Sequence, residues 1–93
     1  MSTYRLEDFK QPGNDDKLQV VTFYEKNDDG TEKDGTTLEE MLKVSIARLQ
    51  ELNSRFGCRE NSVAITKMQE ALMWLEERTK DRIKRGVEGK HEA

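Results

Sequence analysis

Arginine and lysine side chains gather near the end of the chain in a pattern that can hold phosphate. Five basic residues and one acid occupy positions 78–85. On a helix, Arg78, Arg82 and Arg85 lie at i, i+4 and i+7 of one face, so their guanidinium groups can converge on a polyanion. Basic residues in a last helical turn also offset the negative end of the helix dipole. The residues alone leave both interpretations open, phosphate binding and helix-end charge.

Groupings typical of enzymes are weak in this sequence. The single histidine, His91, is expected to be exposed in a C-terminal tail, so no Ser/His/Asp or Cys/His set can be assembled. The single cysteine, Cys58, excludes an internal disulfide and a thiolate zinc cluster. Paired acids fall in turns or on polar helix faces. We therefore expect no catalysis, no metal and no cofactor.

Length and composition predict one small domain, residues 1–93, that associates with copies of itself. The chain has 33% hydrophobic and 38% charged residues, so a large hydrophobic core within one subunit is not expected. Apolar helix faces left exposed would then pair between subunits. No window approaches the ~18 apolar residues of a membrane span, and no apolar signal core follows Met1. The expected location is the cytoplasm.

The net charge of −3 conceals an asymmetry along the chain. Residues 1–54 carry 7 basic and 12 acidic groups, whereas residues 55–93 carry 9 and 7. Proteins that bind duplex DNA are usually basic over a whole domain, because phosphate contacts dominate their affinity. A compact basic cluster favours a small anionic ligand instead.

The N-terminal segment, residues 1–36, is expected to form a small antiparallel β-hairpin. Residues 18–26 are rich in Val, Thr, Phe and Tyr, which is strand composition. Residues 27–30 supply turn chemistry, and residues 31–33 can return as a short antiparallel partner. Thr3 to Leu6 is a candidate edge strand, and residues 10–17 read as a polar turn.

Two long helices are expected over residues 37–86. Thr37 can cap the first turn while Glu40 completes a capping box. An apolar stripe at three- and four-residue spacing runs to about residue 53. After a short connection, a second helix is expected from residue 60 or 61 to Arg85, ended by Gly86, with 87–93 as a tail. The fold class is therefore α+β: a β-hairpin followed by a long antiparallel αα-hairpin.

The apolar stripe of the second helix changes character at its end. Its spacing continues through Thr79 to Arg82, where the first helix is expected to be too short to cover it. An unpaired buried arginine would be costly, so Arg82 should face a ligand or a partner subunit. A salt bridge between subunits remains an alternative to a binding site. The apolar members of the stripe are Ile65, Met68, Leu72 and Leu75.

Residues 56–75, followed by Arg78-Thr79-Lys80-Asp81-Arg82 and Arg85-Gly86-Val87-Glu88-Gly89, resemble the helical-hairpin domain of phage anti-defence sponges. The first type of Thoeris anti-defence protein is the nearest match, because anti-CBASS sponges share the hairpin but lack a comparable β-segment. The resemblance covers residues 18–90. Its most specific part is the spaced pair of motifs Arg-Thr-x-x-Arg and Arg-Gly-Val-Glu-Gly.

The resemblance implies sequestration instead of catalysis. Members of that family bind glycocyclic ADP-ribose signals made by bacterial TIR proteins without degrading them, and some hold cyclic di- or trinucleotides at separate sites. They assemble as dimers that build into hexamers, with ligand pockets between subunits. The partners implied here are therefore a cyclic nucleotide signal and other copies of this chain, within the host cytoplasm.

Residue roles follow from the same resemblance. Arg78 and Arg82 would grip the pyrophosphate, Asn61 would contact a ring or ribose, and Phe56 would stack on a base. The weaker candidates, named for their proximity or as possible N-terminal contributors, are Arg85, Arg59, Lys84, Lys26 and Arg5.

Two other function classes remain open from the sequence. A strand followed by two helices is also seen in ribbon-helix-helix DNA-binding regulators, although Glu25 and Asp28-Asp29 set acids on and beside the strand. Alternatively, the protein is a structural assembly protein whose arginines only form salt bridges between subunits.

Overall fold

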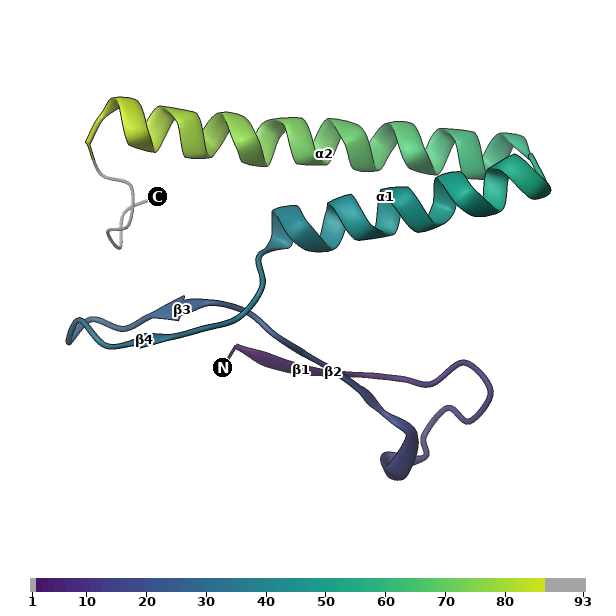
Figure 1. Ribbon diagram of the computed structural model, residues 1–93, viewed down its shortest axis with the longest axis horizontal. Coiled ribbons are helices and arrows are strands. Elements are labelled where there is room, and N and C mark those ends of the chain that lie inside the picture. Colours follow the sequence, from purple (N-terminus) through teal and green to yellow (C-terminus); the bar gives the residue numbers. More distant parts are fainter. Residues whose placement is uncertain (1, 87–93) are drawn as a thin grey trace. The chain divides into compact units, whose positions relative to one another are not determined.

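The computed structural model describes residues 2–86, which divide into two compact units at the boundary between Thr37 and Leu38 (Figure 1). The first unit holds the strands and the second holds the two long helices, so the predicted α+β class is confirmed. The predicted tail, with His91, lies outside the described residues. That residues 1–93 act as one domain stays a prediction.

Two antiparallel strands open the first unit. Strand β1 (Thr3–Leu6) pairs with β2 (Gln19–Thr22), with Thr3 opposite Thr22 and Leu6 opposite Gln19. The edge strand expected at residues 3–6 is therefore confirmed. A 3₁₀ turn, η1 (Asp15–Lys17), lies in the polar connection, where the Asn14 side chain accepts a hydrogen bond from the Asp16 N–H.

The single strand expected over residues 18–26 is instead two strands with different partners. After β2, the chain forms β3 (Glu25–Lys26), which pairs with β4 (Glu32–Lys33) as a second antiparallel ribbon. Between them, the N–H of Phe23 donates to Ser2 O at 2.7 Å and that of Tyr24 to Thr36 O at 2.8 Å. The prediction of one continuous strand was wrong because the chain changes partner here: Phe23 continues the register of β1 and β2, whereas Tyr24 bonds to Thr36.

Gly35 permits the close approach of the returning chain to the junction between β2 and β3. The N–H of Thr36 donates to Thr22 O at 2.9 Å, and Phe23 and Thr36 form an isolated parallel bridge. A Cβ atom at Gly35 would lie 2.5 Å from Thr22 O, which no side chain tolerates without movement of the backbone. Glycine is thus required here for space and not for a positive φ.

The turn between β3 and β4 is held by its own polar side chains. The hydroxyl and the N–H of Thr31 both donate to the Asp29 carboxylate, at 2.6 and 2.9 Å, and these bonds lower the pKa of that carboxyl group. Loss of solvent contact and the nearby Glu32 carboxylate raise the pKa of Tyr24. Local hydrogen bonds, more than burial, define this part of the unit.

The second unit is an antiparallel helical hairpin made of α1 (Leu38–Arg55) and α2 (Arg59–Lys84). The predicted helices are confirmed, with boundaries that differ by one or two residues. Ile46 is the one buried hydrophobic residue among the described residues, and it is still 8% exposed. The rest of the seam is half-buried, so an isolated hairpin leaves much apolar surface in water. On α2 the half-buried positions recur at helical spacing: Asn61, Ala64, Ile65, Met68, Leu72, Leu75, Thr79 and Arg82.

Helix α2 is longer than α1, as the sequence predicted. The Thr79 hydroxyl approaches the Glu39 carboxylate at 3.5 Å, which places the first turn of α1 beside Thr79. Figure 1 shows α2 running on beyond that point. The last turn of α2 therefore has no helix of its own protomer beside it. Among the described residues, neither helix is apolar over enough of its length to cross a membrane.

Candidate functional site

The loop that joins the two helices is closed by hydrogen bonds from Asn53. Its Oδ1 accepts from the Cys58 N–H at 3.1 Å, and its Nδ2 donates to Ser62 Oγ at 3.3 Å. Cys58 then caps α2, because its Sγ accepts from the Asn61 N–H at 3.4 Å. One asparagine near the end of α1 thus bonds across the loop to the N-cap and the first turn of α2. The sequence signal for this role was weak: an Asn placed shortly before a Gly-Cys pair.

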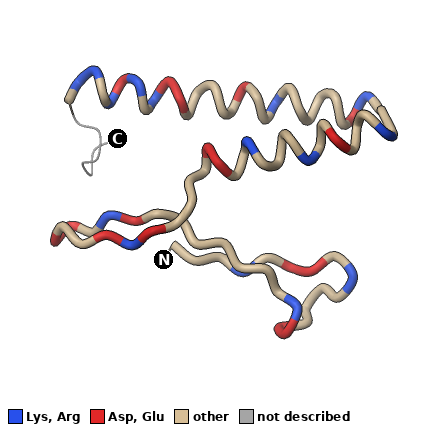
Figure 2. The backbone as a smooth tube through the Cα atoms, viewed as in Figure 1, with Lys and Arg blue, Asp and Glu red and all other residues tan. Residues whose placement is uncertain are grey.

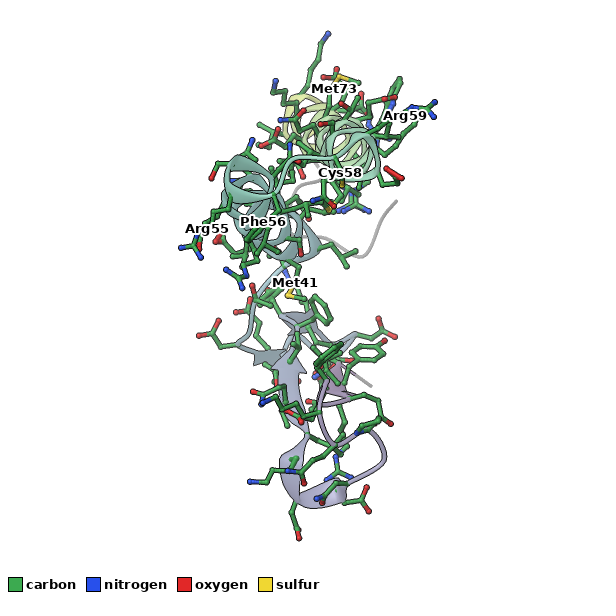
Figure 3. The ribbon with its side chains drawn as sticks, turned by 90° about the vertical axis from the view of Figure 1, so that its right-hand side faces the viewer. Met41, Arg55, Phe56, Cys58, Arg59 and Met73 are labelled. Carbon is green, nitrogen blue, oxygen red and sulfur yellow. The ribbon has the colours of Figure 1, made fainter. Side chains whose placement is uncertain are left out.

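Three of the predicted site residues lie at this loop end of the hairpin. Phe56 projects from the loop and is 79% exposed. Asn61 is half-buried on the seam, in the first turn of α2. Arg59 points away from the hairpin (Figure 3) and lines a shallow hollow on the outer side of α2, together with Ser62, Val63, Thr66 and Lys67. Arg59 and Asn61 therefore face different sides of the same turn.

The other three predicted residues lie at the far end of α2. Arg78 is exposed, and no hydrogen bond or ion pair of its side chain is found within residues 2–86. The Arg85 Nε pairs with the Asp81 carboxylate at 3.0 Å, and the Arg85 N–H donates to Asp81 O. Figure 2 shows basic and acidic residues alternating in these last turns. Arg85 is thus engaged in an ion pair and a backbone hydrogen bond at the end of α2.

Arg82 differs from its neighbours because part of its guanidinium group is buried without a partner. It is half-buried on the continuation of the seam, and its Nε has no hydrogen-bond acceptor among the described residues. An unsatisfied buried donor costs about 1–3 kcal/mol, and more when the group is charged. An anion that reached this nitrogen would remove that cost. Within the described residues, the end of the seam therefore carries a buried hydrogen-bond donor that has no acceptor.

The three arginines share one strip of α2. At 100° per residue, Arg78, Arg82 and Arg85 fall within an arc of about 60°. A guanidinium group donates in a fixed planar fork that matches phosphate oxygens. No histidine lies near them in the described chain, and no group of acids and sulfur or imidazole ligands there could hold a metal. The arrangement is suited to holding an anion by charge and hydrogen bonds.

The two groups of predicted residues are far apart within one protomer. Asn61 and Arg82 are separated by 21 positions of a continuous helix, which is a rise of about 32 Å. An anion that contacted Arg82 could therefore not also touch Asn61 or Phe56 of the same chain. A single pocket that uses both groups needs two subunits.

Three further candidate site residues lie outside the loop group and the group of three arginines. Lys84 is exposed in the last turn of α2, beside the arginines in sequence. Arg5 lies in β1, opposite Val20, and Lys26 lies in β3, opposite Glu32. These last two belong to the first unit.

Comparison with known proteins addresses the helical hairpin directly. The family model described as the Acb2/Tad1 hairpin domain matches residues 16–80, which include both helices up to Arg78 and Thr79. A protein of Bacillus phage SBSphiJ7 named Thoeris anti-defense 1 is 56% identical over 59 residues, covering 62% of this chain and 42% of that protein. The chain thus matches less than half the length of this relative. Because the matched region contains the seam, the closed loop and the first of the three arginines, the chain belongs to the Acb2/Tad1 hairpin-domain family.

Proposed function

We propose that this protein is a phage anti-defence sponge that binds a cyclic nucleotide immune signal and withholds it without cleaving it. The observation that carries the proposal is the buried Nε of Arg82, which has no acceptor among the described residues. Membership of the hairpin-domain family and the similarity to Thoeris anti-defense 1 point to the same class of protein. The preferred ligand is a glycocyclic ADP-ribose isomer, with cyclic di- and trinucleotides as further candidates.

In this proposal, Arg82 and Arg78 bind the pyrophosphate. Their positions differ by one helical turn, or a rise of about 6 Å, so two guanidinium groups can hold neighbouring phosphate groups of one ligand. Arg82 comes from the seam and is already desolvated in part, whereas Arg78 is exposed. Charge-assisted bonds from both would neutralise the ligand where water has been excluded. Arg85 and Lys84 add positive charge nearby, although Arg85 is engaged with Asp81.

A second copy of the chain completes the pocket. Because the helices are antiparallel, residues turned in the same sense from the seam lie on one broad face of the hairpin. Helical geometry places Arg78 of α2 and the exposed Leu38 of α1 (54%) on that face, and Phe56 is exposed at the loop end of the hairpin. If two hairpins associate through this face in opposite directions, the loop end of one lies beside the arginine end of the other. Asn61 and Phe56 of a second subunit would then reach the ligand.

Dimers of this kind would assemble further into hexamers that offer several preformed pockets. Retention without chemistry suits the arginines at this end, because a guanidinium group donates hydrogen bonds and has no acceptor. The host cytoplasm, where such signals act, is the proposed location.

Isothermal titration of the full chain with glycocyclic ADP-ribose tests this function. We expect tight binding, and heating the complex should release intact ligand. Arg82→Ala should abolish binding while the oligomer persists in analytical ultracentrifugation. The matched control is Arg48→Ala, since Arg48 is exposed and pairs only with Glu51 within α1 at 3.1 Å; this variant should bind as the unchanged protein does.

Three results would contradict the proposal. Recovery of a cleaved ligand would indicate an enzyme. Dissociation of the oligomer by Arg82→Ala, with no nucleotide bound by the unchanged protein, would favour an assembly protein. A salt-sensitive shift of duplex DNA, without cyclic nucleotide binding, would favour a DNA-binding regulator.

A further inference from the structure

Trp74 is a large apolar side chain on the exposed surface of α2. It is 67% exposed, and it is the one aromatic residue in α2 and the one tryptophan of the chain. An indole ring in water on a helix surface loses the favourable burial that such rings usually provide. The exposed position of this ring therefore suggests that a binding partner covers it in the functional state.

The surroundings of Trp74 are cationic. Trp74 and Arg78 are four positions apart, so they are neighbours on the helix surface. At 100° per residue, Trp74 falls within about 40° of Arg78 and Arg85 and about 80° of Arg82. The ring thus adjoins the arginine strip, one turn before it. Phe56, the aromatic residue expected from the sequence, lies at the opposite end of the hairpin of the same protomer.

We propose that Trp74 is the stacking surface for a base of the nucleotide whose phosphates Arg78 and Arg82 hold. The inference rests on the proposed function and narrows its ligand to one with an aromatic base next to a pyrophosphate. The rise of about 6 Å from Trp74 to Arg78 is of the order of the distance between a base and the phosphate of its own nucleotide. Charge complementarity selects the occupant, because a purely apolar partner would bury the guanidinium group of Arg78 without an acceptor.

A ring at this position also gives a reason for selectivity. Inorganic phosphate, pyrophosphate and sugar phosphates reach the arginines but have no flat surface to place on the indole. A nucleotide engages both, and stacking on an aromatic side chain tolerates any base. The sponge would therefore bind the abundant simple phosphates of the cell more weakly than a nucleotide.

The single tryptophan reports on its own environment. Titration of the full chain with glycocyclic ADP-ribose should quench the Trp74 fluorescence at the same stoichiometry and concentration as calorimetry detects binding. Inorganic pyrophosphate should bind more weakly and leave the emission spectrum nearly unchanged. Trp74→Ala should weaken nucleotide binding by about 10-fold or more and leave pyrophosphate affinity unchanged, whereas Trp74→Phe should recover most of the loss.

Met73→Ala is the matched control. Met73 is 52% exposed and projects from the hairpin (Figure 3), about 100° around the helix from Trp74. This variant should bind both probes as the unchanged protein does.

Separate outcomes would overturn the inference. Tight calorimetric binding without any change in fluorescence would exclude Trp74 from the site while the sponge function stands. Dissociation of the oligomer by Trp74→Ala, with unchanged affinity at protein concentrations that restore it, would make Trp74 an interface residue. Absence of any nucleotide binding would remove the proposed function and this inference together.

Discussion

The two ends of the helical hairpin are built on opposite principles. At the loop end, the Asn53 side chain on α1 bonds across the turn to Cys58 and Ser62, and Cys58 caps α2. At the other end, α2 runs past the start of α1, and Arg82 keeps a buried nitrogen without an acceptor within the described chain. One end is complete within a protomer and stabilises the fold. The other end leaves a buried donor unsatisfied within the described residues, which costs stability, and in the proposed function it is the end that binds the ligand.

Substitution of Arg82 by methionine should separate binding from stability most clearly. The methionine side chain fills similar space without the unsatisfied donor, so the free energy of unfolding should stay equal or rise by up to about 1 kcal/mol. Affinity for glycocyclic ADP-ribose should fall about 100-fold or more, because a desolvated charged hydrogen bond is lost. Urea unfolding and calorimetry measure the two effects. A large loss of stability would show that Arg82 already has a partner.

At the loop end, Asn53→Ala should lower the stability of the fold and leave ligand affinity unchanged. Two hydrogen bonds are lost, and the Cys58 N–H loses its acceptor, so the free energy of unfolding should fall by about 1–2 kcal/mol. Urea unfolding followed by circular dichroism measures it. Ser54→Ala is the control, since the Ser54 hydroxyl bonds only to Glu51 O within α1, and its effect should be within about 0.5 kcal/mol. Equal effects of both variants would contradict a special role for Asn53.

Arg78→Ala tests the exposed half of the phosphate grip. Because Arg78 is in water, its loss should cost about 10-fold in affinity, less than the loss of Arg82, and should leave the unfolding curve unchanged. The remaining affinity should depend less on salt concentration. Lys80→Ala removes the same charge on a different side of α2 and should have little effect. If Lys80→Ala weakens binding as much, only general charge attracts the ligand.

The smallest change is expected from Cys58→Ser. Serine is a preferred helix N-cap, so the free energy of unfolding should stay equal or rise by up to about 0.5 kcal/mol, whereas Cys58→Ala should lower it by about 1 kcal/mol. Thermal unfolding of both variants under reducing conditions gives the comparison. A serine variant as unstable as the alanine variant would show that the cap is unimportant.

Much of the molecule followed from local patterns. Composition and turn residues predicted the β-segment, and the apolar stripes predicted both helices, because side-chain periodicity reports which face is buried. The split between β2 and β3 was missed, since the N–H groups of Phe23 and Tyr24 bond to Ser2 and Thr36, which are distant in sequence. The need for glycine at position 35 was also not predicted, because it arises from another part of the backbone that passes close to it.

For the site, the sequence by itself determined the residue types, the shared strip of arginines and the helix that carries them, because helical geometry fixes which positions lie together. Only the tertiary structure decided which arginine is half-buried with a side-chain nitrogen that has no acceptor among the described residues. That burial depends on where α1 begins relative to α2. Local sequence cannot encode that, since burial is a property of the neighbours that the fold brings near.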